Sequence, residues 1–572
     1  MSPAQAEQIA AQLALAEAVA PPPVNSSPTR QAATRFLTQA TFGATQQEVD
    51  RVRAIGYQAW LNEQFAAPVS SMSHLSAWDA SDKAIRAIDA GSRATKGNVV
   101  SSFWREAITS PDQLRQRVAF ALSEIFVISV TDSCGDNAFS RGAADYLDTL
   151  GRQAFGSYRA LLESVAIHPI MGCYLSHIKN QPEDTPTGRV PDENFAREIM
   201  QLFSIGLYEL NADGTHKTDA HQQPIETYSA SDISGMAKVF TGWSWWCSQG
   251  QTAGCFFSNP NHPEQLVTSM RGYALYHSTA EKSFLGTVIP ASTWATPESS
   301  LKVALDTLAS HPNVGPFIGK QLIQRLVTSN PSPAYVQRVA NAFKLSGGSM
   351  KAMVTAILLD PEARDMASLG SDRFGKVREP VLRFSALLRS MGAHSDSGMF
   401  LIMATEDPGF ALAQSALSSS SVFNFFRPGY VKPGSQSASA LLLAPELQIA
   451  TETSSAGYVN YLMYFLRHGT GLNGYDRKAS RADVQLLANI DPDHALLTLA
   501  DKPADLVEEI NQRLMYGTMP LALKTEIVGA VQSVGAGLLS NLSVEKLTEN
   551  RRRRLWSALL LTMASPEFQI QK

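Results

Sequence analysis

Residues 191–206 combine acidic, amide and basic side chains with helical spacing. Four of the polar residues lie at positions i, i+3, i+4 and i+7: Asn194, Arg197, Glu198 and Gln201. A helix would present all four on one face, and Glu193 would pair with Arg197 four residues later. A carboxyl group held by an arginine and an amide suits general acid–base chemistry, because burial and the arginine charge set its pKa. We therefore predict Glu198 as the acid/base, Arg197 and Asn194 as its positioning groups, and Glu193 as a further catalytic candidate.

The apolar residues of the same segment predict the helix that positions this cluster, over 192–206. Ile199, Leu202 and Phe203 recur at helical spacing. Pro191 suits the first turn, where its missing N–H costs nothing, and Gly206 suits a left-handed C-cap. The alternative interpretation is a buried ion pair that only fixes helix packing, since such pairs also have perturbed pKa values.

His168 and Tyr174 precede this helix and are the other catalytic candidates. If their segment folds against it, a Tyr/His/Glu group flanked by Arg197 would suit glycoside cleavage or elimination from a polyuronate. Glycoside hydrolysis needs a second carboxyl group at a defined separation. The candidates for that group are Asp192, Glu193 and Asp232.

Aromatic side chains are dense in and beside residues 245–290, which are rich in Gly, Ser, Asn and Pro. Sugar rings stack on exposed aromatic faces, so we predict a substrate-binding wall made of Trp243, Trp245, Trp246, Tyr276 and His277. The alternative is that these rings fill a small core beneath a long loop.

Most of the remaining chain has the apolar periodicity of helices. We expect a mainly α fold with a small β-hairpin at 208–227, signalled by Asp213-Gly214, and an irregular insertion at 245–290. Helices are predicted at 98–129, 143–167, 229–241, 297–310, 314–328, 333–345, 349–358, 376–392, 442–468, 481–488, 502–515, 520–534 and 543–564. The expected organisation is a flexible terminus (1–30), a main helical lobe (31–390) and a C-terminal helical lobe (391–572).

The composition favours a soluble, exported protein. The 572 residues are 44% hydrophobic and 17% charged, with a net charge of −4, which gives no basis for nucleic-acid binding. No stretch has the length and apolarity of a membrane span. The Ala/Gln-rich start and the proline-rich residues 20–28 resemble a mature exported terminus, so we predict a periplasmic or secreted protein, with a cytosolic protein as the alternative.

Four cysteines fit an oxidising compartment. Cys247 and Cys255 bracket a turn-rich loop and are expected to form a disulfide, and Cys134 and Cys173 a second one. A zinc site is the competing interpretation, but the Cys-x-x-Cys and Cys-x-x-His spacings are missing from the sequence. Phosphate-loop, dinucleotide and metalloprotease motifs are missing as well, so we expect no metal and no cofactor.

Several short motifs occur in order along the chain and together resemble one bacterial family. They are RFLTQATFG from Arg35, HPIMGCY from His168, ENFARE from Glu193, YSASD from Tyr228, FTGW from Phe240, YH at Tyr276, KSFLG from Lys282, HP at His311, KVREP from Lys376, NFFRPG from Asn424 and SPEF from Ser565. From about residue 31 onward the chain resembles the family catalogued as domain of unknown function 1800. The family usually has Asp after the histidine of the YH motif, where this chain has Ser278.

The resemblance implies an exported, predominantly helical protein, often encoded beside a partner that resembles the alkaline-phosphatase/sulfatase superfamily. The residues themselves lead us to expect a glycoside hydrolase or polysaccharide lyase acting on an extracellular polysaccharide. The alternative is a non-catalytic envelope-binding or assembly protein that works with the sulfatase/phosphatase-like partner. A cleft beside Glu198 would favour the enzyme, and buried, mutually satisfied polar groups would favour the assembly protein.

Overall fold

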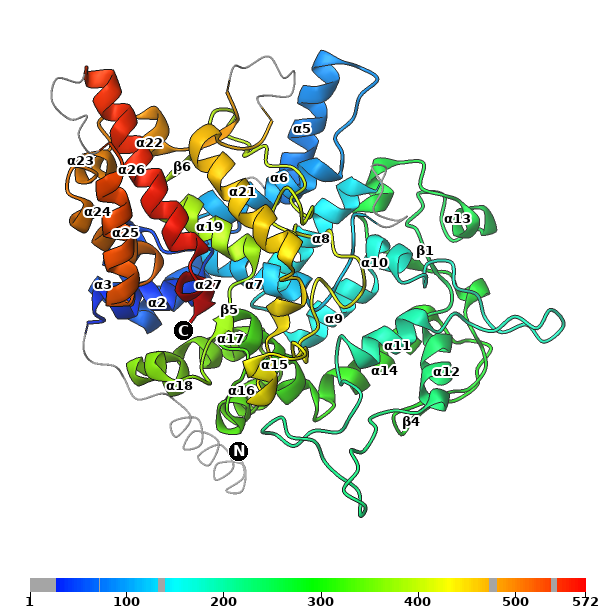
Figure 1. Cartoon of the computed structure of the whole chain (residues 1–572). Coiled ribbons are helices and arrows are strands. Elements are labelled where there is room, and N and C mark those ends of the chain that lie inside the picture. The colour runs from blue at the N-terminus through cyan, green and yellow to red at the C-terminus, as the bar shows by residue number, and fades with distance from the viewer. Residues whose placement is uncertain (1–26, 71–72, 132–138, 473–480, 536–542) are drawn as a thin grey trace.

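The computed structural model describes residues 27–70, 73–131, 139–472, 481–535 and 543–572. The fold is mainly α, as the sequence predicts, and Figure 1 shows helices throughout the molecule. Residues 1–26, which make up most of the predicted flexible terminus, lie outside the described residues, as does Cys134.

The N-terminal third forms short helices that follow one another closely. They are α2 (Arg30–Ala40), α3 (Gln46–Ile55), α4 (Tyr57–Ala66), α5 (His74–Ile88), α6 (Lys96–Thr109), α7 (Gln113–Ser123), α8 (Ser140–Gln153), α9 (Tyr158–Ala166) and α10 (Pro169–Tyr174). The single helices predicted over 98–129 and 143–167 are each divided in two. Pro111 interrupts the first, because a proline cannot continue the hydrogen-bond ladder. Ser157 starts a new helix in the second by capping the N–H of Ala160.

The middle of the chain contains the segments that surround the candidate site. Its helices are α11 (Asn194–Gln201), α12 (Ala230–Val239), α13 (Ala253–Phe257), η2 (Pro263–Leu266), η3 (Ala274–Tyr276), α14 (Pro297–Ser310), α15 (Val314–Leu326), α16 (Pro333–Leu345), α17 (Met350–Leu359), α18 (Pro361–Arg364) and η4 (Met366–Gly370). Between α11 and α12 the chain makes antiparallel bridges at Tyr208–Glu226, Leu210–His216 and Thr218–Pro224. The hairpin predicted at 208–227 is therefore present.

The C-terminal part packs beside the first helices of the chain. Its helices are α19 (Pro380–Ser390), α20 (Gln436–Ser439), η5 (Pro445–Gln448), α21 (Glu452–His468), α22 (Leu487–Ile490), α23 (Ala495–Leu499), α24 (Pro503–Leu514), α25 (Leu521–Ser533), α26 (Val544–Ala564) and α27 (Pro566–Gln569). Figure 1 shows α24 next to α2, where Arg30 pairs with Glu509 at 3.3 Å. The helix predicted over 442–468 begins ten residues late, at Glu452, where Thr451 and Ser454 form a capping box.

The described strands are short and pair two by two, all antiparallel. β1 (Trp243–Ser244) pairs with β2 (Arg271–Gly272), β3 (Lys282–Phe284) with β4 (Thr287–Ile289), β5 (Lys376–Val377) with β8 (Ile570–Gln571), and β6 (Ala393–Ser395) with β7 (Val484–Leu486). The helix predicted over 481–488 is wrong, since 484–486 is strand. Its alternating burial suits a strand paired with β6.

One hydrophobic core runs through the described chain from Ala33 to Phe568. It includes buried rings from both predicted lobes, such as Trp104, Tyr158 and Phe465. A second, small cluster lies in the insertion and consists of Cys255, Phe256 and Tyr273. The large core fixes the helices around the candidate site.

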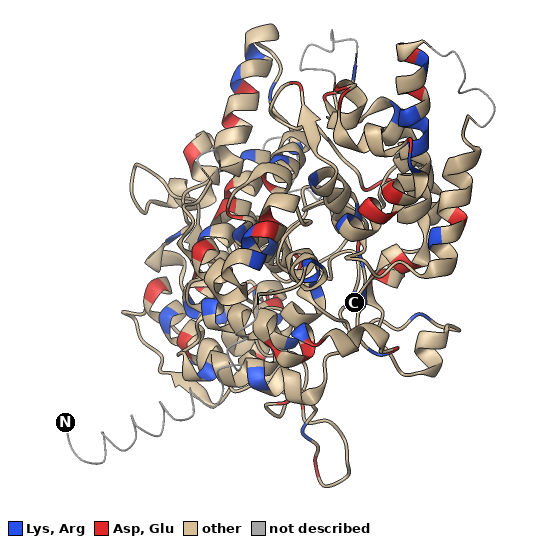
Figure 2. Cartoon of the chain, turned by 90° about the vertical axis from the view of Figure 1, so that its left-hand side faces the viewer, with Lys and Arg blue, Asp and Glu red and all other residues tan. Residues whose placement is uncertain are grey.

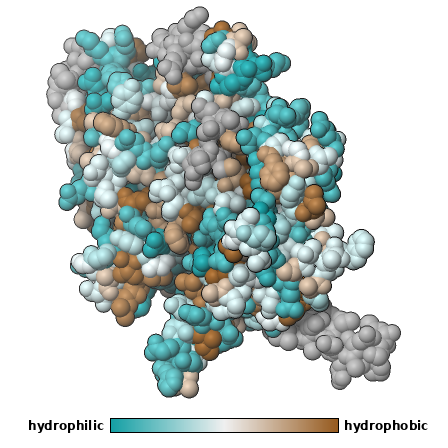
Figure 3. Space-filling view, turned by 90° about the vertical axis from the view of Figure 1, so that its right-hand side faces the viewer, coloured by the Kyte–Doolittle hydropathy of each residue, from teal (hydrophilic) through white to brown (hydrophobic). Residues whose placement is uncertain are grey.

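The surface is mixed in charge and polarity. Figure 2 shows acidic and basic residues interspersed over one side of the molecule, and Figure 3 shows hydrophobic residues scattered among hydrophilic ones on the opposite side. Among the described helices, none has the length and apolarity required to cross a membrane.

Candidate functional site

The helix that carries the predicted acid/base is shorter than the sequence indicates. α11 begins at Asn194 rather than 192, with Glu193 at the N-cap position, and Asp192 Oδ1 accepts the N–H of Asn194 at 2.8 Å. Pro191 therefore precedes the helix. The chain leaves α11 after Gln201 and turns through Gly206, whose φ of 74° is left-handed. Gly206 therefore does have the expected left-handed conformation, but it lies five residues after the end of α11 rather than directly at its C-cap.

Glu198 is buried on α11, with 8% of its surface exposed. Burial raises the pKa of its carboxyl group, and the nearby charge of Arg197 opposes that rise. Arg197 itself forms an exposed ion pair with Glu193, at 3.8 Å. Glu193, Arg197 and Asn194 thus lie toward solvent, while Glu198 faces inward.

The histidine and tyrosine candidates end up in different settings. His168 is buried at the N-cap of α10, where its Nδ1 accepts the N–H of Ile170 at 3.3 Å and its Nε2 lies 3.2 Å from Asp145 Oδ2. Tyr174 is half-buried at the end of α10 and packs against the main core. The polar partners of His168 are thus Asp145 and Ile170, in place of the predicted Glu198.

The aromatic residues of the insertion pack mainly inward. Trp243 and Trp245 are 4% and 3% exposed, while Trp246 is half-buried. Tyr276 stacks on Phe256 with ring centroids 4.1 Å apart. The arrangement resembles the small core that the sequence offered as the alternative to a sugar-binding wall.

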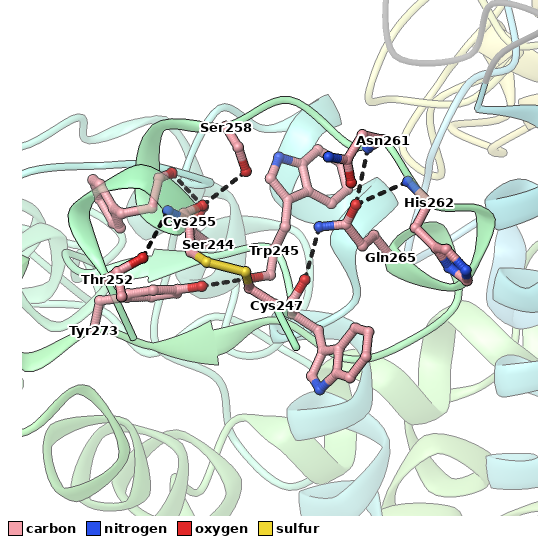
Figure 4. The surroundings of a disulfide bond; sticks show 12 residues. Ser244, Trp245, Cys247, Thr252, Cys255, Ser258, Asn261, His262, Gln265 and Tyr273 are labelled. Carbon is pink, nitrogen blue, oxygen red and sulfur yellow. Dashed lines mark hydrogen bonds between the residues drawn. A yellow bond between two sulfur atoms is a disulfide. The ribbon is translucent and has the colours of Figure 1, made fainter. Parts of the chain in front are cut away.

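Figure 4 shows how the disulfide fastens this small core. Cys247 and Cys255 are bonded, as predicted, and Tyr273 OH donates a hydrogen bond to the carbonyl oxygen of Trp245 at 2.8 Å. Gln265 Nε2 donates to the carbonyl oxygen of Trp246 at 2.8 Å. The insertion is therefore tied together by side-chain to backbone bonds around one covalent link.

His277 is buried behind the insertion and fully engaged. Its Nδ1 lies 2.9 Å from the carbonyl oxygen of Thr241, and its Nε2 lies 2.8 Å from Ser300 Oγ. Burial lowers the pKa of His277 to about 4, so the ring is neutral at neutral pH. Ser278 donates instead to Glu183 Oε1, at 2.8 Å.

A cavity of about 670 Å³ lies elsewhere, between the end of α11, the hairpin, α15 and the loop after residue 421. Gln201 and Leu202 of the α11 segment line it, but Glu198, one turn earlier, does not. Aromatic rings surround the space, and they belong to Tyr208, His216, Phe317, Phe423 and Tyr430. The predicted helix therefore contributes its end to the cavity rather than its acid.

Helix α15 supplies one complete face of this cavity. Phe317, Lys320, Gln321 and Gln324 lie at intervals of three and four residues, which places them on one side of a helix. Arg325 continues the same lining. The face thus combines one ring, two amides and two cations.

Glu124 lines the same cavity, immediately after the last residue of α7, and is 5% exposed. Asn424 Nδ2 donates to its Oε1 at 2.9 Å, and Arg325 Nε lies 3.7 Å from its Oε2. Burial raises the pKa of Glu124 well above its usual range, and the negative charge of Glu379 raises it further, against the pull of Arg325. The surroundings of Glu124 thus favour its protonated form more than water would.

Buried charges behind Glu124 hold it and Arg325 in place. Arg325 Nη2 donates to the carbonyl oxygen of Glu124 at 2.9 Å, and Lys376 Nζ donates to that of Arg325 at 2.8 Å. Lys376 also pairs with Glu446 at 3.1 Å, with both side chains at most 2% exposed. This network connects the cavity to the β5 segment of the core.

The NFFRPG motif closes the cavity on its other side. Asn424 has a φ of 61°, a left-handed conformation that asparagine tolerates better than most residues. The carbonyl oxygen of Pro428 accepts Gln324 Nε2 at 3.2 Å, and the guanidinium of Arg427 lies 4.5 Å from the ring of Phe423. The loop is therefore attached both to Glu124 and to α15.

Sequence reasoning missed Glu124, Lys320 and Arg325 as site residues. A signal was present for Glu124, which is charged yet lies within an apolar helical stretch, as fully buried acids rarely do without a partner. The Asn424 motif was visible as well, but its pairing with Glu124 spans 300 positions. Spacing alone does not indicate contacts at that separation.

The chain belongs to the family described as "Protein of unknown function (DUF1800)", which it matches over residues 35–570. The resemblance seen in the sequence motifs is thereby confirmed. Neither the curated proteins nor the solved structures provide a match.

Proposed function

We propose that the protein is an exported carbohydrate-active enzyme, a glycoside hydrolase or polysaccharide lyase acting on an extracellular polysaccharide, with Glu124 as its general acid. The observation that carries the proposal is a buried carboxyl group of raised pKa in the lining of a cavity of about 670 Å³. A carboxyl group whose pKa is raised holds its proton more readily than a free one and can donate it to a leaving glycosidic oxygen.

The geometry around Glu124 supports this role. Asn424 donates to Oε1, and Oε2 has no hydrogen-bond partner among the described residues. Oε2 is thus the oxygen on which a transferable proton would sit. Arg325, 3.7 Å away, stabilises the carboxylate that remains after the transfer.

The lining of the cavity supports a sugar as the substrate. Rings of Tyr208, Phe317 and Tyr430 offer apolar faces for stacking, and the amides of Gln201 and Gln321 offer groups that bond hydroxyls. The Cys247–Cys255 disulfide supports export, because such bonds persist in oxidising compartments.

The test is a panel of polysaccharides incubated with the full-length protein and assayed for new reducing ends and for ultraviolet-absorbing unsaturated products. We expect turnover of at least one polymer and its loss in Glu124→Gln. Full activity of Glu124→Gln would overturn the assignment of the acid. Silence of the wild-type protein across the panel would favour the alternative, a non-catalytic envelope-binding or assembly protein with a sulfatase/phosphatase-like partner.

A further inference from the structure

The cavity carries an excess of positive charge. Its described lining contains three cations, Lys320, Arg325 and Arg427, and a single carboxyl group, Glu124. Even if Glu124 is counted as a carboxylate, the cations of the lining outnumber it. The electrostatics of the cavity favour an anionic ligand.

Two of these cations have no anionic partner among the described residues. Lys320 is half-buried, and burial lowers its pKa without a compensating carboxylate. Within the described chain, the guanidinium of Arg427 lies over the ring of Phe423 and pairs with no carboxylate. By contrast, Arg325 interacts with Glu124. Lys320 and Arg427 thus remain available to a ligand.

Polar atoms beside these cations also lack partners within the described chain. Gln321 is 8% exposed, and its Nε2 makes no hydrogen bond, although the residue lines the cavity. Glu124 Oε2 and Arg325 Nε make no hydrogen bond either, and they form an ion pair with each other at 3.7 Å. Leaving a buried polar atom without a hydrogen bond is costly, so a ligand group that bonds Gln321 Nε2 would gain affinity.

Resting on the proposed function, we propose that the cavity takes a uronate residue of an acidic polysaccharide and that the reaction is β-elimination. The uronate carboxylate would bind Lys320 and the amide of Gln321. Glycoside hydrolysis uses two carboxyl groups of the enzyme, and the described lining provides one. Elimination needs one base for the C5 proton and one acid for the leaving oxygen, and the carboxylate of the substrate acidifies the C5–H bond.

The elimination balances with residues of this lining. His216, across the hairpin and 5.2 Å from the ring centroid of Tyr208, accepts the proton from C5 of the uronate. The electrons of the C5–H bond form the C4=C5 double bond, and the C4–O4 bond breaks. O4 leaves with the proton of Glu124. Lys320 and Gln321 stabilise the charge that develops on the substrate carboxylate.

The experiment uses the full-length protein with polygalacturonate, polymannuronate and glucuronan, each beside its carboxyl-reduced, neutral counterpart. We expect at least one polyuronate to yield an ultraviolet-absorbing unsaturated end and the neutral polymers to yield none. New reducing ends from neutral polymers without that absorbance would overturn this inference and leave the proposed function standing. If neither the polyuronates nor the neutral polymers gave any product, both this inference and the proposed enzymatic function would be overturned.

A binding measurement isolates the carboxylate contact. Oligouronates are titrated calorimetrically into Glu124→Gln, which keeps the shape of the cavity but removes the acid. Adding Lys320→Met should weaken binding at least tenfold, whereas adding Lys344→Met, an exposed lysine of α16 outside the cavity lining, should not change it. Equal binding by both double variants would overturn the assignment of Lys320. His216→Gln should retain binding and lose turnover, and undiminished turnover would overturn its role as the base.

Discussion

Two regions of the protein hold buried groups suited to acid–base chemistry, and they differ in where those groups find their partners. In and near the insertion, His277 bonds Thr241 and Ser300, and His168 bonds Asp145. At the cavity, Glu124 Oε2 and Gln321 Nε2 make no hydrogen bond within the described chain, and both residues line the cavity. The first pattern stabilises a fold, whereas the second leaves bonding capacity for a ligand.

Glu198 combines one feature of each region: its carboxyl group is incompletely hydrogen-bonded, but it does not line the cavity. Its Oε2 is also unpartnered among the described residues, and its pKa is also raised by burial. However, Glu198 is absent from the lining of the cavity, to which Gln201 on the same helix contributes. The comparison shows that a perturbed carboxyl group becomes a strong catalytic candidate when a space for substrate adjoins it.

The largest expected effect separates the two acids directly. Glu124→Gln should lower turnover about 1,000-fold, equivalent to about 4 kcal/mol in the activation barrier, because an amide cannot donate the acid's proton to the leaving group. Glu198→Gln makes the same chemical change one helix turn from the cavity and should retain most of the activity. Initial rates with the polymer found in the panel provide the measurement.

The melting temperatures of both variants serve as the control. Each should stay within a few degrees of the wild type, since glutamine preserves the size and most contacts of glutamate. If Glu198→Gln abolished turnover without a change in melting temperature while Glu124→Gln remained active, the acid predicted from the sequence would be the correct one.

The next effect concerns the predicted aromatic wall. Trp245 is 3% exposed and stacks with Phe139 at 6.2 Å. Trp245→Ala should lower the free energy of unfolding by about 3.5 kcal/mol, because it leaves a large cavity in the packing. Trp294→Ala is the matched control, since that side chain is 89% exposed and its removal should have almost no effect. Urea unfolding measures the free energy of unfolding of both variants. If Trp245→Ala were stable but bound sugar more weakly, the predicted substrate-binding role of this tryptophan would be supported instead.

Acid should destabilise the region around His277. The pKa of His277 is about 4 in the folded protein and about 6.5 in an unfolded chain, so the unfolded state binds more protons between these values. The contribution of His277 to the free energy of unfolding is fully present above pH 6.5. It falls by up to about 3 kcal/mol as the pH drops toward 4. His177, whose pKa is also lowered to about 4, adds to the same slope.

Urea unfolding at a series of pH values measures this dependence. His277→Gln should make the slope between pH 6.5 and 4 shallower, whatever its effect on stability at pH 7. An unchanged slope would mean that His277 takes up its proton in the folded state.

The sequence predicted the local parts of the molecule better than the contacts between them. Apolar periodicity placed the long helices near α14, α16 and α26, because side chains three and four residues apart meet whatever the rest of the chain does. It failed at 484–486, where pairing with β6 determines the conformation. The Cys247–Cys255 bond could be predicted from the sequence because a short loop joins the two residues.

The candidate site was harder to predict for the same reason. It brings together Glu124, α15 and Asn424, segments 100 to 300 positions apart, and the local sequence of each does not indicate that it meets the others. Lys320 and Arg325 resemble exposed helical cations in sequence. Only the fold shows that they line a cavity and that Lys320 lacks a carboxylate partner in the described chain.

The smallest effect tests the two regions against each other. Replacing Cys247 and Cys255 by serine opens a loop with a sequence separation of 8 residues, which should cost about 2.5 kcal/mol on the loop-entropy account. The loss should be local, because the small cluster around Cys255 is separate from the main core that holds the cavity. Hydrogen exchange should therefore accelerate in the insertion and remain slow in α15. If the cavity is the site, kcat/KM on the polysaccharide stays near the wild-type value, whereas a proportional fall in kcat/KM would mean that the insertion contributes to substrate binding.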